Sequence, residues 1–207
     1  MNFRPGQLLL AAMILAVLAG HASAQSTVTV PPSTLQAIFS GSLPPPAATQ
    51  GDVTVVEYFD YDCPVCRHLE PELRKLVAHD PKVRLLRKDW PVFGDASEYA
   101  AYYSFAAARA GRYQAAHDAL IASRQDLDSK EAVQTVLQAA GFDVRKLDAD
   151  IKAHTREYSD VLARNRRETA ELGLRGTPGL IVGNQLVLGG VDYPMLELLV
   201  GRARKNH

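Results

Sequence analysis

The feature that most constrains the fold is a strand-to-helix junction that carries the only two cysteines of the chain, Cys63 and Cys66. Residues 53–59 (VTVVEYF) are mostly β-branched or aromatic and are bounded by turn residues, so they predict a buried strand. Apolar residues then recur at helical spacing over 65–77, and residues 82–90 (KVRLLRKDW) predict a second strand. This order favours a parallel β-α-β unit with a right-handed crossover.

The rest of the chain predicts a helical region followed by a hairpin and a last helix. The expected helices are Asp95–Ala107, Tyr113–Ala122, one from Asp128 to Gly141, one capped by Asp143, Thr155–Leu172 and one capped by Asp192. Two short apolar runs flank Gly183-Asn184, which is a strong hairpin signal. The predicted class is therefore α/β, with a helical insertion at about residues 95–172.

The N-terminal residues predict export. Arg4 precedes an apolar run over residues 8–19, and Ala22-Ser23-Ala24 matches the small-x-small pattern of signal peptidase sites. We expect residues 1–24 to be a cleaved signal peptide; a signal anchor is the alternative, although the run is shorter than the ~20 residues that span a bilayer. Residues 25–50 predict an arm and linker: Ser33 caps a short helix, and three prolines at 44–46 extend the chain. Whether this arm packs on its own domain or on a second subunit stays open.

Composition and charge narrow the function. The chain has 207 residues, of which 47% are hydrophobic, and its formal net charge is zero. A balanced charge gives no electrostatic reason to expect a nucleic-acid partner. A chain of this length buries a full core without disulfide bonds. A disulfide bond that closes a three-residue loop constrains the unfolded chain little. The two cysteines therefore favour redox chemistry over a structural role.

The tetrapeptide Cys63-Pro64-Val65-Cys66 places one thiol at a helix N-cap. Pro64 suits the first helical position, and the free N–H groups and partial positive charge of the helix N-terminus stabilise a thiolate at Cys63. A stabilised thiolate is a nucleophile and a good leaving group. We therefore predict that Cys63 is the exposed attacking thiol and Cys66 the more buried resolving thiol.

Other roles for these residues are weaker. Covalent haem attachment requires histidine where Arg67 stands, and a structural zinc site requires four ligands. Two thiolates still suit a soft ion such as Cu(I). Glu57 either faces solvent at a strand edge or lies beneath the thiols, where a raised pKa lets it relay protons to Cys66. Four histidines are expected on helix surfaces and five tyrosines in the core or at its rim: His68, His79, His117 and His154, and Tyr58, Tyr61, Tyr99, Tyr102 and Tyr103.

Two segments resemble one known family. VVEYFDYDCPVCRHLEP resembles the active-site segment of DsbA-type thiol:disulfide oxidoreductases of the thioredoxin superfamily, and RGTPGLIVGNQLVLGGVD (residues 175–192) resembles the second signature of that family. The resemblance covers nearly all of residues 51–207. It implies a thioredoxin-like fold with an inserted helical domain, and chemistry that needs no bound cofactor.

The resemblance also implies roles for individual residues. Cys63 matches the nucleophile and Cys66 the resolving thiol. Pro178 matches the cis-proline beside the thiols, and Thr177 matches the residue whose backbone pairs with the substrate peptide. Glu57 matches the acidic residue beneath the active site, which favours the second of its two interpretations.

The implied function is a periplasmic oxidoreductase that exchanges disulfides with cysteine-containing exported proteins and is reset by a DsbB-like or DsbD-like membrane partner. Pro64 and Val65 tune the thiols, and Lys88 is a candidate charged partner of Glu57. The strong oxidases of the family have histidine at the position of Val65, so this chain is expected to be less oxidising. The alternatives are an isomerase or reductase of the same fold, or a copper-tolerance protein that binds Cu(I) through the thiols. The oligomeric state is not predicted.

Overall fold

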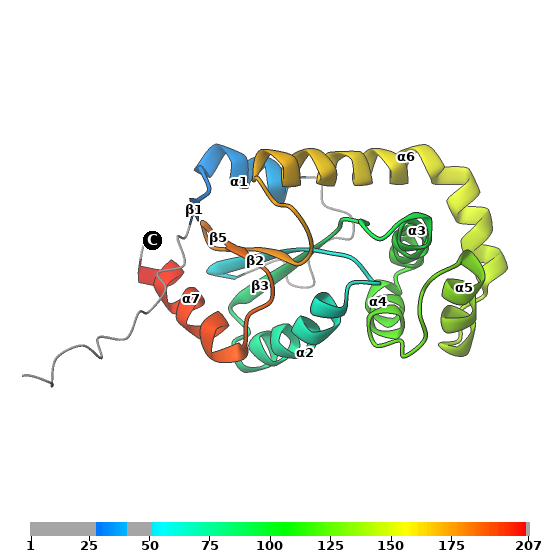
Figure 1. The fold of residues 1–207 in the computed structure, drawn as a ribbon, viewed down its shortest axis with the longest axis horizontal. Helices are drawn as coiled ribbons and strands as arrows, with labels where there is room; N and C mark the ends of the chain where they lie inside the picture. Colours follow the sequence, from blue (N-terminus) through cyan, green and yellow to red (C-terminus); the bar gives the residue numbers. More distant parts are fainter. Residues whose placement is uncertain (1–27, 41–50, 206–207) are drawn as a thin grey trace, which may run out of the picture.

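A five-stranded mixed sheet, in the order β1-β5-β4-β2-β3, lies at the centre of the molecule (Figure 1). The structure is a computed structural model that describes residues 28–40 and 51–205. Its elements are β1 (Val28–Thr29), α1 (Pro32–Phe39), β2 (Val53–Phe59), α2 (Pro64–His79), β3 (Val83–Asp89), α3 (Asp95–Arg109), α4 (Tyr113–Ile121), α5 (Lys130–Ala139), α6 (Val144–Glu171), β4 (Gly179–Val182), β5 (Gln185–Leu188) and α7 (Tyr193–Lys205).

Strand pairing confirms the two main predictions for the sheet. β2 and β3 pair in parallel, and α2 is the helix that connects them. β4 and β5 form the predicted antiparallel hairpin, in which Gly183 takes a left-handed φ of 62°. Because β4 pairs antiparallel with β2, the turn that precedes β4 lies at the carboxyl end of β2, where the cysteines follow.

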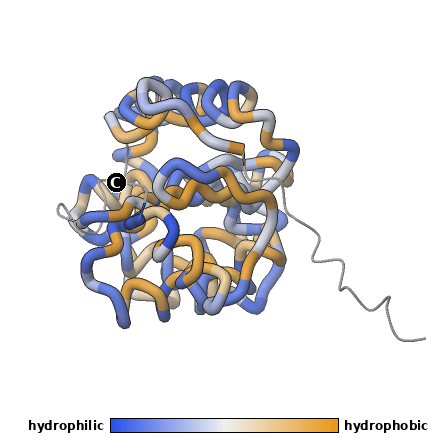
Figure 2. The backbone as a smooth tube through the Cα atoms, turned by 90° about the vertical axis from the view of Figure 1, so that its left-hand side faces the viewer, coloured by the Kyte–Doolittle hydropathy of each residue, from blue (hydrophilic) through white to orange (hydrophobic). Residues whose placement is uncertain are grey.

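Helices cover both faces of the sheet. The β2 side chains at odd positions, such as Val53 and Val55, pack on α2 and α7, whereas Val56 and Tyr58 face α1 and the end of α6 (Figure 1). Figure 2 shows hydrophobic residues along the central strands, between these helical layers. This arrangement, with α3, α4, α5 and the start of α6 inserted between β3 and β4, confirms the thioredoxin-like fold with a helical insertion.

The predicted helices in the insertion differ from the structure mainly at their ends. The two helices expected after Asp143 are one helix, α6, whose backbone leaves helical values only at His154. Nδ1 of His154 lies 2.9 Å from the carbonyl oxygen of Asp150, and the helix continues beyond this residue to Glu171. The caps of α3 and α5 are Gly94 and Ser129, one residue from the predicted Asp95 and Asp128.

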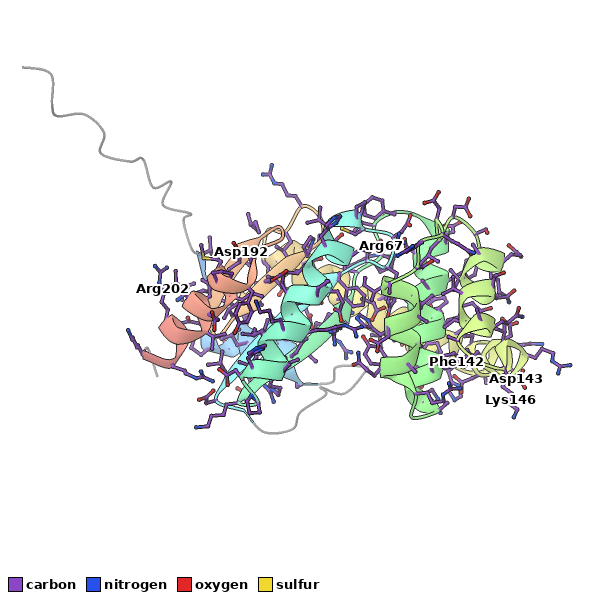
Figure 3. All side chains as sticks on the ribbon, turned by 90° about the horizontal axis from the view of Figure 1, so that it is seen from below. Arg67, Phe142, Asp143, Lys146, Asp192 and Arg202 are labelled. Carbon is purple, nitrogen blue, oxygen red and sulfur yellow. The ribbon has the colours of Figure 1, made fainter. Side chains whose placement is uncertain are left out.

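Two predicted caps lie where expected. The Asp143 carboxylate accepts a hydrogen bond from the backbone N–H of Lys146 at 3.4 Å, and that of Asp192 accepts one from Met195 at 3.1 Å. Figure 3 labels both aspartates at the starts of α6 and α7. Among the residues that the structure describes, no helix combines the length and the apolar character needed to cross a membrane.

The described part of the arm, residues 28–40, packs on the sheet. β1 pairs antiparallel with β5, and Val30 and Ile38 are buried against strand residues of the sheet. Ser33 does not cap α1: the N-cap is Pro31, and Pro32 opens the helix, because proline suits a first turn whose N–H groups have no helical partners. The predicted signal peptide and the prolines at 44–46 lie outside the described residues.

Candidate active site

Cys63 is the N-cap of α2, immediately after the turn that ends β2. Its Sγ accepts a hydrogen bond from the backbone N–H of Cys66 at 3.3 Å, and it lies 3.4 Å from the carbonyl oxygen of Thr177, to which the protonated thiol donates. The carboxylate of Asp60 holds the turn by accepting from the N–H groups of Val92 and Phe93, at 2.6 and 3.1 Å. The reactive sulfur is therefore held by the helix N-terminus on one side and by the loop before β4 on the other.

The two thiols differ strongly in acidity. The neighbouring thiol of Cys66 is the main cause that lowers the pKa of Cys63 from 9.0 to about 6; the nearby Thr177 side chain and the backbone N–H groups of Val65 and Cys66 act in the same direction, and burial opposes them. Burial, followed by the hydrogen bond to Cys63 and the charge of Glu57, raises the pKa of Cys66 far above its usual range. At neutral pH the first cysteine is a thiolate and the second a thiol.

Cys63 is less exposed than predicted. Its relative exposure is 2%, and that of Cys66 is 0%. The expectation of an exposed attacking thiol is therefore wrong for this conformation: Cys63 belongs to the buried cluster that contains Tyr61, and its sulfur lies against the carbonyl of Thr177. Both thiols are buried in this conformation, and they differ in acidity because hydrogen bonds lower the pKa of Cys63 whereas burial raises that of Cys66.

The Thr177-Pro178 peptide bond is cis, as the resemblance implies. Pro178 is buried, and its carbonyl accepts a hydrogen bond from the N–H of Gly189 at 3.0 Å. Thr177 is half-buried, and its Oγ1 has no hydrogen-bond partner. Tertiary folding thus brings these residues from the β4 side of the sheet to Cys63.

Pro64 and Val65 are exposed beside the thiols, and 47% of Val65 is accessible. Val65 lies against Gly190, where a Cβ atom would approach Val65 Cγ1 to 2.9 Å. Arg67, labelled in Figure 3, donates hydrogen bonds to the carbonyl of Tyr61 at 2.8 Å and to the carboxylate of Asp62 at 3.2 Å. The residues around the cysteines therefore combine a rigid turn with an accessible apolar side chain.

Glu57 lies in the interior, with 2% exposure, and not at a solvent-facing strand edge. Its Oε2 has no hydrogen-bond partner, and Nε of Arg87 lies 3.7 Å away. Burial is the main cause that raises the pKa of Glu57 from 4.5 to about 8, and the charges of Glu70 and Cys63 add to it. The carboxyl group is therefore mainly protonated at pH 7 and electrostatically linked to both thiols.

Arg87, and not Lys88, is the charged neighbour of Glu57. Glu57 is paired with Arg87 in the β2–β3 register, so the two side chains share a face of the sheet. Lys88 points to the opposite face, where its Nζ contacts the carboxylate oxygens of Glu168 at 2.8 and 2.6 Å. The predicted Lys88–Glu57 pair is therefore wrong by one position, and one position in a strand reverses the face.

A buried polar cluster joins Glu57 to the helical insertion. Both oxygens of Glu70 accept hydrogen bonds from Nη2 of Arg87 at 2.9 Å, and Nε2 of His117 lies 3.3 Å from Oε2 of Glu70. Nδ1 of His117 is 3.2 Å from the hydroxyl of Tyr61. His117 is fully buried, so the expectation that it lies on a helix surface is wrong, because α4 turns this face toward α2.

Sequence reasoning missed Arg87, Glu70 and His117 as site residues. The register of β2 on β3 would have identified Arg87. For Glu70 and His117 the sequence offers no strong signal, because their burial depends on how α2 and α4 pack against each other. His68 and His79 are exposed and His154 is half-buried. Of the five tyrosines expected in the core or at its rim, Tyr99 is exposed and the other four are buried. Among the described residues, no three His, Cys, Asp or Glu side chains gather as metal ligands would.

Comparisons with known proteins agree with this geometry. The family model of the DsbA-like thioredoxin domain matches residues 54–201. A thioredoxin-like oxidoreductase from Silicibacter pomeroyi has a similar structure, with a TM-score of 0.72 and 38% identity over 75% of this chain and 88% of that one. A periplasmic thioredoxin-like protein from Salmonella enterica serovar Typhimurium also has a TM-score of 0.72, with 25% identity over 86% of this chain and 99% of that one.

Among curated proteins, the thiol:disulfide interchange protein DsbA of Bordetella parapertussis is 26% identical over 173 residues, which are 78% of this chain and 82% of that protein. The chain also matches Na⁺/H⁺ antiporters such as NhaA 3 of Salinispora tropica, with 28% identity over 73% of the chain, but it spans only 23% of the length of that protein. The family model covers well over half of the chain, and its relatives include named thiol:disulfide interchange proteins. The chain therefore belongs to the family of DsbA-like thioredoxin domains.

Proposed function

We propose that this protein is a periplasmic thiol:disulfide oxidoreductase that exchanges disulfides with cysteine-containing exported proteins. The observation that carries the proposal is the unequal pair of thiols at the start of α2, with the pKa of Cys63 near 6 and the pKa of Cys66 strongly raised. A thiolate next to a buried thiol is the arrangement that two-step disulfide exchange requires.

The chemistry follows from this inequality. When a substrate thiolate attacks Sγ of Cys63 in the oxidised protein, the Cys63–Cys66 bond breaks and its electron pair stays on the Cys66 sulfur, which takes up a proton. The protonated carboxyl of Glu57 is the buried acid available to supply it. A second substrate thiolate then displaces Cys63, which leaves as a thiolate, and the substrate holds the disulfide. In the reverse direction Cys63 attacks a substrate disulfide and Cys66 resolves the mixed disulfide.

We assign substrate contact to Thr177 and Pro178. The Thr177 carbonyl reaches the Cys63 sulfur, so a peptide bound along this loop would lie next to the reactive atom.

Export rests on the signal-peptide pattern of residues 1–24, and the similarity to a periplasmic thioredoxin-like protein supports it.

Turnover requires a partner that resets the thiols, and we propose a DsbB-like or DsbD-like membrane protein. The reduction potential decides between them: about −120 mV favours disulfide donation, and about −270 mV favours reduction. Val65 places no cation beside Cys63, which supports a value below that of the strongest oxidants.

Trapping of a mixed disulfide tests the exchange function. We expect Cys66→Ala to accumulate a mixed disulfide with a model peptide that contains one disulfide, because no thiol resolves it, and Cys63→Ala to form none. Mass spectrometry of the adducts gives the result. If wild-type protein exchanges no disulfide but binds Cu(I) stoichiometrically, the copper-binding alternative replaces this proposal.

A further inference from the structure

His117 connects the helical insertion to two elements of the active site. It is fully buried on α4; its Nδ1 lies 3.2 Å from the Tyr61 hydroxyl, in the turn before Cys63, and its Nε2 lies 3.3 Å from Oε2 of Glu70, on α2. Glu70 also accepts hydrogen bonds from Arg74 and Arg87, so it acts as an acceptor. The imidazole N–H is therefore on Nε2, and Nδ1 accepts from the hydroxyl.

The contact between His117 and Glu70 bears on where the positive charge of Arg87 lies. The guanidinium gives Nη2 to both oxygens of Glu70 at 2.9 Å, whereas its Nε stays 3.7 Å from Oε2 of Glu57. Neither that Nε nor that oxygen has a hydrogen-bond partner. Arg87 thus lies between two carboxyl groups and is committed mainly to one of them.

The Nε2–H of His117 faces the same carboxylate but is not aligned for a full hydrogen bond. It still brings a second N–H group to 3.3 Å from an oxygen of Glu70 that also accepts a hydrogen bond from Arg87. After burial, which acts in the opposite direction, the contact with His117 is the largest cause of the low pKa of Glu70, about 2. Burial lowers the pKa of His117 itself to about 4, so the ring is neutral at pH 7.

We propose that His117 is a positioning residue of the thiol pair: by sharing the carboxylate of Glu70, it sets how much of the Arg87 charge remains for Glu57. This inference rests on the proposed function and extends the site into the helical insertion. The ionisable groups that face the imidazole are Tyr61 from the turn, Glu70 from α2, Arg87 from β3, and Tyr113 and Asp118 from α4.

Loss of the imidazole N–H is expected to raise the pKa of Glu57. Glu70 keeps its charge but loses a donor, so Arg87 moves further toward it and away from Glu57. Glu57 then has less opposite charge nearby, and its pKa rises above about 8. Because ionised Glu57 disfavours the Cys63 thiolate, the change also appears in the thiol titration.

The test is an ultraviolet titration of the Cys63 thiolate in reduced protein. Wild type should show a main inflection near pH 6 and a weaker one near pH 8, and Glu57→Gln should lose the weaker one. In His117→Phe we expect the weaker inflection to move up by about one pH unit, the change that partial loss of a nearby opposite charge produces. His117→Gln, which keeps an N–H donor, should restore at least half of the shift.

Two further variants separate positioning from packing. Tyr113→Phe removes a hydroxyl 3.4 Å from Nδ1 but leaves the Glu70 side intact, so the weaker inflection should stay in place. Glu70→Gln frees Arg87 for Glu57, so this inflection should move down, and His117→Phe should add no shift in that background. The second comparison also serves if His117→Phe alone does not fold.

An unchanged weaker inflection in folded His117→Phe would overturn the inference, as would equal shifts in His117→Phe and His117→Gln. These titrations need no substrate. A protein that fails in disulfide exchange but shows the predicted shifts would contradict the proposed function and leave the role of His117 standing.

Discussion

Replacing the buried acid Glu57 with glutamine should stabilise the reduced protein, and the gain should depend on pH. The carboxyl group has a pKa of about 8 in the folded protein and 4.5 as its unperturbed value. A folded pKa raised above the unfolded one means that the folded state binds the proton more tightly. The contribution of this group to stability is therefore complete below pH 4.5 and is lost as the pH rises through 8.

The magnitude follows from the same two values. At pH 7, about 2.5 pH units above the unperturbed pKa of 4.5, the unfolded chain has already lost the proton, whereas the folded protein mostly keeps it. At about 1.4 kcal/mol per unit, folding with this acid buried costs about 3 kcal/mol at pH 7 relative to a neutral side chain of the same shape. Glutamine removes this cost because its amide does not titrate.

Urea denaturation of both proteins under reducing conditions, at several pH values from about 4 to 8, measures the difference. We expect similar stability near pH 4 and an advantage for Glu57→Gln that grows to about 3 kcal/mol by pH 7. An advantage that is constant with pH, or one that decreases as the pH rises, would refute the assignment of a raised pKa to Glu57. Glu131→Gln, at an exposed position of α5, is the control and should show no such trend.

Four other measurements test the site and the fold. The thiolate absorbance of reduced protein should show a midpoint near pH 6, and Cys63→Ser should abolish it. Val65→His should lower that midpoint and raise the reduction potential, because it places an imidazolium beside the thiolate; an unchanged potential would contradict this. Lys88→Met should destabilise the protein by about 3–5 kcal/mol by leaving Glu168 buried without its cation, and Lys88→Met with Glu168→Leu should recover most of the loss in urea denaturation. Ile38→Ala should cost about 2–5 kcal/mol in the same assay, and a cost near zero would show that the arm does not contribute to the core.

Local chemistry explains what could be predicted at the cysteines. The bond from the backbone N–H of Cys66 to the sulfur of Cys63 joins residues three apart, and it forms wherever a strand leads into a helix at this position. The roles of Thr177 and Pro178 came from the family resemblance, and folding brings them to Cys63 across 114 residues. The Thr177 carbonyl also lies against the Cys63 thiol, which was expected to be exposed.

Strand register and helix packing decided which other residues lie near the thiols. The sequence places Arg87 and Lys88 side by side, and only the pairing of β2 with β3 shows which of them shares a face with Glu57. His117 was expected on a helix surface, and it is buried because α4 packs against α2.

Taken alone, the sequence determined the elements, the family and the redox pair, because these depend on neighbours in the chain and on recurrent motifs. The tertiary structure decided which charges face the thiols, because burial and opposition across a sheet depend on residues far apart in the chain.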